Sequence, residues 1–109
     1  MKQKKKTRVY ISAPISGCDL QERKDAFLRM EVILRGRGYD VFNPLGEQNH
    51  IDGLSTHEYM RNDITELLKC DAIILLDGWN KSAGCKCELD VAVACGLDVW
   101  FEKTEAFEV

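Results

Sequence analysis

The sequence predicts an α/β fold of three layers, in which a parallel sheet of about four strands lies between helices. Short runs rich in β-branched and aromatic residues alternate along the chain with longer stretches whose apolar residues recur at helical spacing. One of the short runs, residues 72–76, is apolar throughout, which is typical of a strand buried on both faces of a parallel sheet. At 109 residues the chain is long enough for one hydrophobic core.

The first half of the chain predicts a strand, a helix and a second strand. Residues 8–12 are rich in β-forming side chains, and a proline and a glycine follow them. Asp19, with Glu22 three residues later, resembles the capping box of a helix start. The helix that follows carries apolar residues at helical spacing: Leu20, Phe27, Met30 and Leu34. We expect it to end at the glycines of residues 36–38, before a strand over residues 39–42.

The second half repeats this alternation. Residues 45–54 are polar and without periodicity, so they predict a loop. Ser55 and Glu58 form another capping box. The apolar residues that follow share one helical face: Met60, Ile64, Leu67 and Leu68. After the strand over residues 72–76 we expect a turn, and then a further helix.

We expect this last helix to end at Gly96, before a strand over residues 98–101. Strands that alternate with helices form parallel sheets with right-handed crossovers. The sequence therefore predicts a small flavodoxin-like or Rossmann-like three-layer sandwich.

Composition indicates a single globular domain over residues 8–109 behind a basic, flexible tail over residues 1–7. The formal charge of −3 gives the chain no electrostatic reason to bind nucleic acid. No apolar stretch approaches the roughly 20 residues that a membrane span needs. The basic start has no apolar segment after it, unlike a secretory signal, so we expect a cytoplasmic protein.

The five cysteines are an odd number in a chain without an export signal, which favours reduced thiols. Cys85 and Cys87 lie two residues apart, but no second ligand pair has a suitable spacing, and His50 and His57 follow no such pattern. We therefore expect no metal site.

Glu88 is the most unusual residue of the sequence. On a helix it shares one face with Val91, Ala92 and Cys95, which we expect in the core. A carboxylate on an inward face is costly unless it is paired, solvated or used in chemistry.

Asp63 is a second carboxylate of interest, because it lies at the margin of the apolar face of the preceding helix. Two such carboxylates can divide the roles of nucleophile and proton donor, as at a sugar anomeric carbon. The alternative is structural: Asp63 pairs with Arg61 or Lys69, and Glu88 accepts a bond from a backbone donor.

Ligands of open parallel sheets bind beyond the carboxyl ends of the strands. We expect three segments there: the turn after the first strand, the loop that ends at Ser55, and the turn before the helix of Glu88. The candidate binding residues in the first and third segments are Ser12, Ala13, Pro14, Ile15, Ser16, Gly17, Ser82 and Gly84. Tyr10 either holds the Glu88 carboxylate through its hydroxyl or only packs in the core. Dinucleotide, P-loop and nucleophile-elbow glycine motifs are absent from the sequence.

Three motifs in order resemble the nucleoside 2-deoxyribosyltransferase superfamily, which includes the deoxynucleoside-monophosphate N-glycosidases and short uncharacterised bacterial and phage proteins. They are the run from Tyr10 to Gly17, the pair Asn62-Asp63, and Ser82-x-Gly84-x-x-x-Glu88 with the apolar residues after it. The likeness extends from Arg8 to Phe101.

The resemblance implies an enzyme of the N-glycosidic bond that acts on a nucleoside or nucleoside 5′-monophosphate as hydrolase or transferase, without a cofactor. It implies that Glu88 attacks the anomeric carbon of the sugar and that Asp63 protonates the leaving base. It also implies that Tyr10 orients the nucleophile and that Ser82 contacts a 5′-phosphate. It also implies a homodimer or higher homo-oligomer.

Two other functions stay open. Lys86 and Asp90 stand where related enzymes usually have glycines, which favours a non-catalytic nucleotide- or nucleotide-sugar-binding module. A partner-binding domain with Trp79 and Trp100 at an interface is the third possibility.

Overall fold

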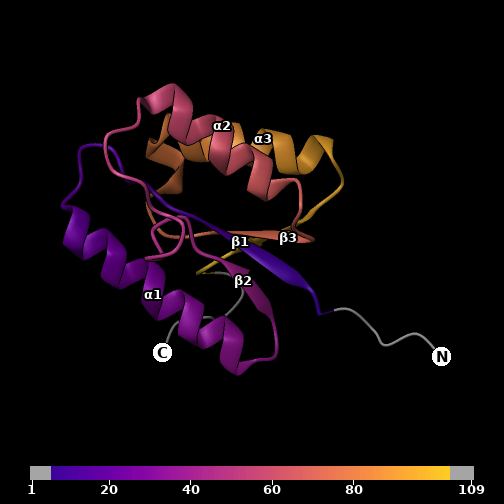
Figure 1. Cartoon of the computed structure of the whole chain (residues 1–109). Helices are drawn as coiled ribbons and strands as arrows, with labels where there is room; N and C mark the ends of the chain where they lie inside the picture. Colours follow the sequence, from indigo (N-terminus) through magenta and orange to yellow (C-terminus); the bar gives the residue numbers. More distant parts are fainter. Residues whose placement is uncertain (1–5, 104–109) are drawn as a thin grey trace.

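The computed structural model describes residues 6–103 and has the predicted architecture. A parallel sheet of four strands has the order β2-β1-β3-β4. The strands are β1 (Arg8–Ser12), β2 (Asp40–Phe42), β3 (Ala72–Leu75) and β4 (Asp98–Phe101). Helix α1 (Leu20–Gly36) lies on one side of the sheet, and α2 (Thr56–Leu67) and α3 (Ala83–Ala94) lie side by side on the other (Figure 1). The three-layer α/β sandwich predicted from the sequence is confirmed.

Alternation along the central strands separates two cores. Val9 and Ile11 of β1 face α1, where Phe27, Met30 and Leu34 pack on them. Tyr10, between them, faces α2 and α3 and joins a cluster with Leu67, Cys85 and Ala92. Because side chains of a strand alternate between faces, Ser12 lies on the same side of the sheet as Tyr10.

The two capping boxes of the sequence begin helices, with one difference. The Ser55 hydroxyl accepts from the Glu58 amide while the Glu58 carboxylate accepts from the Ser55 amide. At α1, Asp19 accepts from the Glu22 amide, and the Glu22 side chain instead lies against Arg23. Each helix start is therefore held by its cap.

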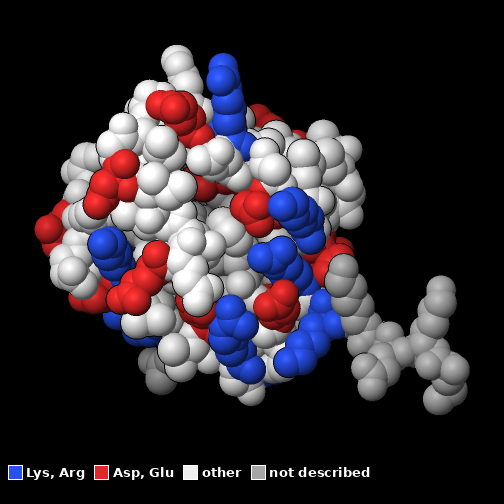
Figure 2. Space-filling model, in the orientation of Figure 1, with Lys and Arg blue, Asp and Glu red and all other residues white. Residues whose placement is uncertain are grey.

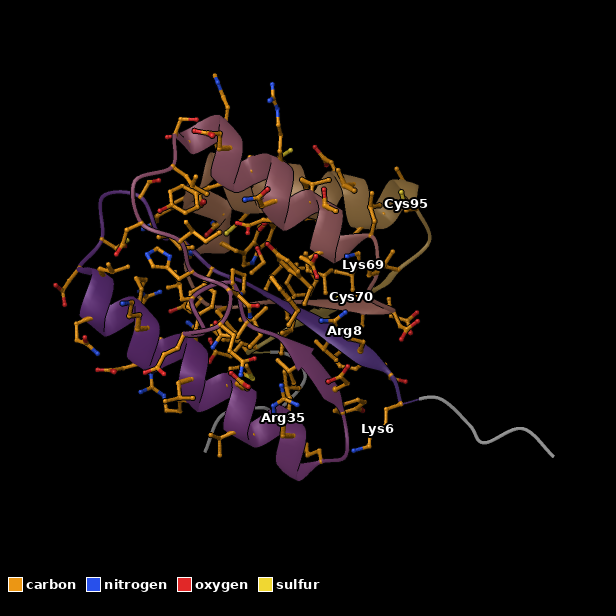
Figure 3. The ribbon with its side chains drawn as sticks, in the orientation of Figure 1. Lys6, Arg8, Arg35, Lys69, Cys70 and Cys95 are labelled. Atoms are coloured by element: carbon orange, nitrogen blue, oxygen red, sulfur yellow. The ribbon has the colours of Figure 1, made fainter. Side chains whose placement is uncertain are left out.

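Several apolar residues near helix ends are exposed, contrary to the expectation from helical spacing. Leu68 and Leu20 are 53% and 40% exposed, and Cys95 is exposed as the C-cap of α3 (Figure 3). Leu68 is likewise a C-cap, where the chain leaves the helix and the apolar face no longer continues. Strand β2 begins at Asp40, one residue later than predicted, and the turn before α3 contains a short 3-10 helix over Trp79–Lys81.

The charges on the face of Figure 2 are mixed, with basic and acidic side chains interspersed. Within residues 6–103 no helix is long and apolar enough to cross a membrane. The cysteines are all free, and three of them, Cys18, Cys87 and Cys95, are exposed. Most of the basic tail lies outside the described residues, apart from Lys6 and Thr7.

Candidate active site

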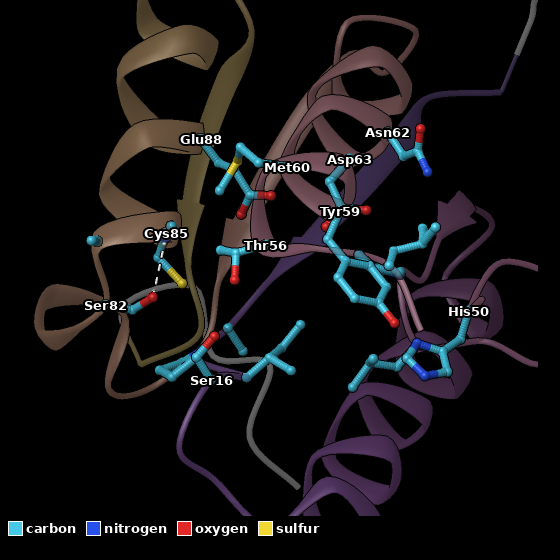
Figure 4. Close-up of a pocket in the computed structure, with 18 of the residues that line it drawn as sticks. Ser16, His50, Thr56, Tyr59, Met60, Asn62, Asp63, Ser82, Cys85 and Glu88 are labelled. Carbon is cyan, nitrogen blue, oxygen red and sulfur yellow. Dashed lines mark hydrogen bonds between the residues drawn. The ribbon is translucent and has the colours of Figure 1, made fainter. Parts of the chain in front are cut away.

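A cleft of about 770 Å³ opens at the carboxyl end of the sheet, where strand order reverses between β1 and β3. It is lined by the turn after β1, the loop after β2, one face of α2 and the first turns of α3. Glu88 and Asp63 both line it, Glu88 from α3 and Asp63 from α2 (Figure 4).

Two side-chain hydroxyl groups of β1 donate hydrogen bonds to the Glu88 carboxylate. The Tyr10 hydroxyl donates to Oε2, and the Ser12 hydroxyl donates to Oε1 over 2.8 Å. All three side chains are buried, with exposures of 7% for Glu88 and 1% for both hydroxyl residues. The carboxylate is therefore fixed by side chains of the neighbouring strand, and the alternative of a backbone donor is wrong.

Burial raises the pKa of Glu88 above its usual value, and the two hydroxyl bonds lower it in part. Burial and the charge of Glu88 also raise the pKa of Tyr10, which keeps the phenol protonated as a donor. These opposing effects give a carboxylate that is partly desolvated yet held in one orientation.

Asp63 is half-buried and has neither a hydrogen bond nor an ion pair within residues 6–103. Burial, followed by the nearby charge of Glu88, raises the pKa of Asp63 to about 7. Lys69 pairs instead with Glu66 over 3.0 Å, so the predicted structural alternative for this helix does not involve Asp63. The two carboxyls therefore form an interacting pair in which Asp63 gains and loses its proton near neutral pH.

The start of α3 forms the rim beside Glu88. Ser82 is the N-cap and accepts from the Cys85 amide over 3.2 Å. A Cβ built on Gly84 would lie 3.2 Å from the Met60 Cε atom, so Met60 of α2 packs directly on the first turn of α3. Burial raises the pKa of the Cys85 thiol, and a protonated thiol is a poor nucleophile compared with the fixed carboxylate.

The structure separates the other predicted binding residues into two groups. Ala13, Pro14, Ile15 and Ser16 line the cleft with Ser82 and Gly84. Ser12 lies behind Glu88 rather than at the surface of the cleft, and Gly17 is exposed and does not line it. Gly17 has a φ of +78°, so its place in the turn reflects backbone conformation.

Sequence reasoning placed the loop after β2 at this edge but named no ligand-facing residue in it. The structure adds a cluster of His50, Tyr59 and Asp52 at the far end of the cleft. The helical spacing of Tyr59 and Asp63, four residues apart on α2, was the signal that these two side chains share a face.

Lys86 and Asp90 are exposed and do not line the cleft. The tryptophans at the β4 side have aromatic neighbours within the chain: Trp79 lies 5.4 Å from Phe101, and Trp100 lies 5.2 Å from Tyr39, between ring centroids. In the described part of the chain, no group of three or more His, Cys, Asp or Glu residues could hold a metal ion.

A family model described as a domain of unknown function (DUF4406) matches residues 7–101. The chain belongs to this family. No curated protein matches the DUF4406 chain.

Among solved structures, the CMP N-glycosidase BcmB of Clostridium botulinum is similar, with a TM-score of 0.61 at 20% sequence identity. The likeness covers 87% of the DUF4406 chain and 70% of the BcmB chain. The two chains share a fold.

Proposed function

We propose that this protein cleaves the N-glycosidic bond of a nucleoside or nucleoside 5′-monophosphate through a covalent intermediate on Glu88. The observation that carries the proposal is the pair of buried hydroxyls, Tyr10 and Ser12, that hold both oxygens of a cleft-lining carboxylate. The neighbouring Asp63 has a raised pKa and no competing partner within residues 6–103. The similar fold of a CMP N-glycosidase supports the same class of reaction.

The chemistry divides between the two carboxyls. A Glu88 oxygen attacks C1′ of the sugar while the bond from C1′ to the base nitrogen breaks, and Asp63 gives its proton to the departing base. A water molecule then attacks C1′, the Asp63 carboxylate takes a proton from this water, and the bond between C1′ and Glu88 breaks. With a second base in place of water, the same intermediate leads to transfer.

A 5′-phosphate fits the rim at the start of α3. The Ser82 oxygen accepts from the Cys85 amide, and the hydroxyl, which also contacts the Cys85 thiol, can turn its proton to a phosphate oxygen. Lys81 lines the same rim and supplies a positive charge. These contacts favour a nucleotide over a nucleoside.

The non-catalytic binding module remains the second candidate. Its main support was the pair Lys86 and Asp90, but both side chains are exposed outside the cleft and leave the approach to Glu88 open. The enzyme and the binding module would both bind a nucleotide, but only the enzyme would release its base.

Incubation with a panel of ribo- and deoxyribonucleosides and their 5′-monophosphates, followed by chromatography, tests the proposed function. We expect release of free base from at least one 5′-monophosphate. Tight binding of a nucleotide without release of base from any member of the panel would establish the binding module instead.

Ser12→Ala removes one of the two donors to Glu88, and we expect kcat to fall by about tenfold. Because a hydrogen bond to the ionised form lowers a carboxyl pKa, its loss raises the pKa of Glu88 further. The acidic limb of the kcat/KM profile therefore shifts to higher pH. Thr65→Ala, which removes an exposed hydroxyl of α2 outside the cleft, is the control and leaves this limb in place. An unshifted limb in Ser12→Ala would show that the serine does not tune the nucleophile.

A further inference from the structure

The far end of the cleft is built from aromatic and apolar side chains. The rings of His50 and Tyr59 lie nearly parallel, with an interplanar angle of 8° and 5.8 Å between centroids. Ile51 and Leu54 line the cleft beside them (Figure 4 shows His50 and Tyr59). We call His50, Ile51, Leu54 and Tyr59 the aromatic wall.

The aromatic wall is fixed by contacts within the chain. The Tyr59 hydroxyl donates to the Ile51 carbonyl oxygen, and the His50 amide donates to the Gly46 carbonyl oxygen over 2.9 Å. Asp52 Oδ1 lies 3.0 Å from His50 Nε2. A planar group that enters the cleft therefore meets a surface already in place, which reduces the entropy lost on binding.

The contact with Asp52 determines which nitrogen of neutral His50 carries the proton. A carboxylate only accepts hydrogen bonds, so Nε2 must be the donor and Nδ1 keeps a free lone pair. Nδ1 has no hydrogen-bond partner within residues 6–103. His50 lines this end of the cleft, so the lone pair of Nδ1 is an acceptor available to a ligand there.

The positions of the two carboxyls orient a nucleotide in the cleft. C1′ must reach Glu88, and an atom of the base that can accept a proton must reach Asp63. Asp63 and Tyr59 lie one turn apart on α2, and both line the cleft. The base consequently lies toward α2 and the aromatic wall, while the 5′ side of the sugar points to Ser82 on α3.

We propose that the aromatic wall binds the nucleobase and that His50 selects bases with an exocyclic amino group, cytosine or adenine, over the oxo bases uracil or hypoxanthine. This inference rests on the proposed function. An amino group donates a hydrogen bond to the free lone pair of Nδ1, whereas an oxo group at the same position places two acceptors against each other. A buried polar group left without its partner lowers affinity by about tenfold or more.

Binding to a variant that cannot turn over tests this selection separately from catalysis. In Glu88→Gln protein, calorimetry with dCMP and dUMP is expected to show about tenfold tighter binding of dCMP. Glu88→Gln/His50→Phe keeps a flat ring against Tyr59 but has no acceptor. We expect this variant to bind both nucleotides with similar affinity, because its affinity for dCMP falls to that for dUMP.

Each other outcome overturns a definite part of the inference. Equal affinity for dCMP and dUMP, or a preference that persists in the His50→Phe variant, contradicts selection by His50 and leaves the proposed function standing. Binding that Tyr59→Ala does not weaken removes the base from the aromatic wall. Absence of binding by any nucleotide of the panel overturns the proposed function together with the inference.

Discussion

Glu88→Gln is expected to abolish turnover, with a loss in kcat of roughly 10⁴-fold or more, the range seen when a catalytic nucleophile is removed. The amide has nearly the same shape as the carboxylate and still accepts one bond from Tyr10 or Ser12, so the fold and the cleft are retained. It cannot form the ester to C1′. The rate of free-base release, monitored by chromatography, measures this loss in kcat.

Asp90→Asn is the matched control, because it makes the same chemical change on the same helix at an exposed carboxylate outside the cleft. It should keep the wild-type rate. Glu88→Ala offers a second check, since an added small anion such as formate or azide can occupy the space of the missing carboxylate and attack C1′. Full activity in Glu88→Gln would exclude a covalent role for this residue.

Asp63→Asn is expected to lower kcat by about 10²- to 10⁴-fold for ordinary bases, the usual contribution of a positioned general acid. The proton donor must be protonated when the substrate binds, and the pKa of Asp63 is raised to about 7 by burial and by the charge of Glu88. The wild-type rate should therefore fall as the pH rises through about 7. In the asparagine variant this basic limb should disappear. Initial rates across the pH range measure both effects.

The leaving group distinguishes a missing proton from a disturbed site. A 7-methylpurine nucleotide carries a positive charge on its base and departs without protonation. We expect Asp63→Asn to cleave such a substrate at close to the wild-type rate, while its rate with the unmethylated purine stays low. An equal loss with both substrates would mean that Asp63 acts on the shape of the site rather than as an acid.

Much of the fold could be predicted because its signals are local. The apolar run of β3 and the capping boxes before α1 and α2 each depend on a few neighbouring residues. The burial of residues at helix ends was predicted less accurately, because local spacing does not show where the chain leaves the helix. Leu68 and Cys95 continue the apolar spacing of their helices, but both lie at C-caps, where the chain turns away from the core.

The site shows which interactions a sequence pattern contains and which require the tertiary structure. Glu88 could be singled out because one carboxylate interrupts an apolar helical face. That Ser12 also holds it follows only from the parallel packing of β1 and β3 under α3, which brings residues 76 positions apart into contact. The aromatic wall likewise depends on how the loop after β2 folds over α2, and no periodic pattern encodes that path.

A covalent sugar on Glu88 is the central claim, and mass spectrometry tests it most directly. Wild-type protein is quenched with acid during turnover of the best 5′-monophosphate of the panel, digested and mapped. A covalent mechanism predicts a peptide containing Glu88 that is heavier by one sugar-phosphate unit, and no such peptide from Glu88→Gln. Steady release of free base with the sugar-phosphate attached elsewhere, or attached equally in Glu88→Gln, would contradict it.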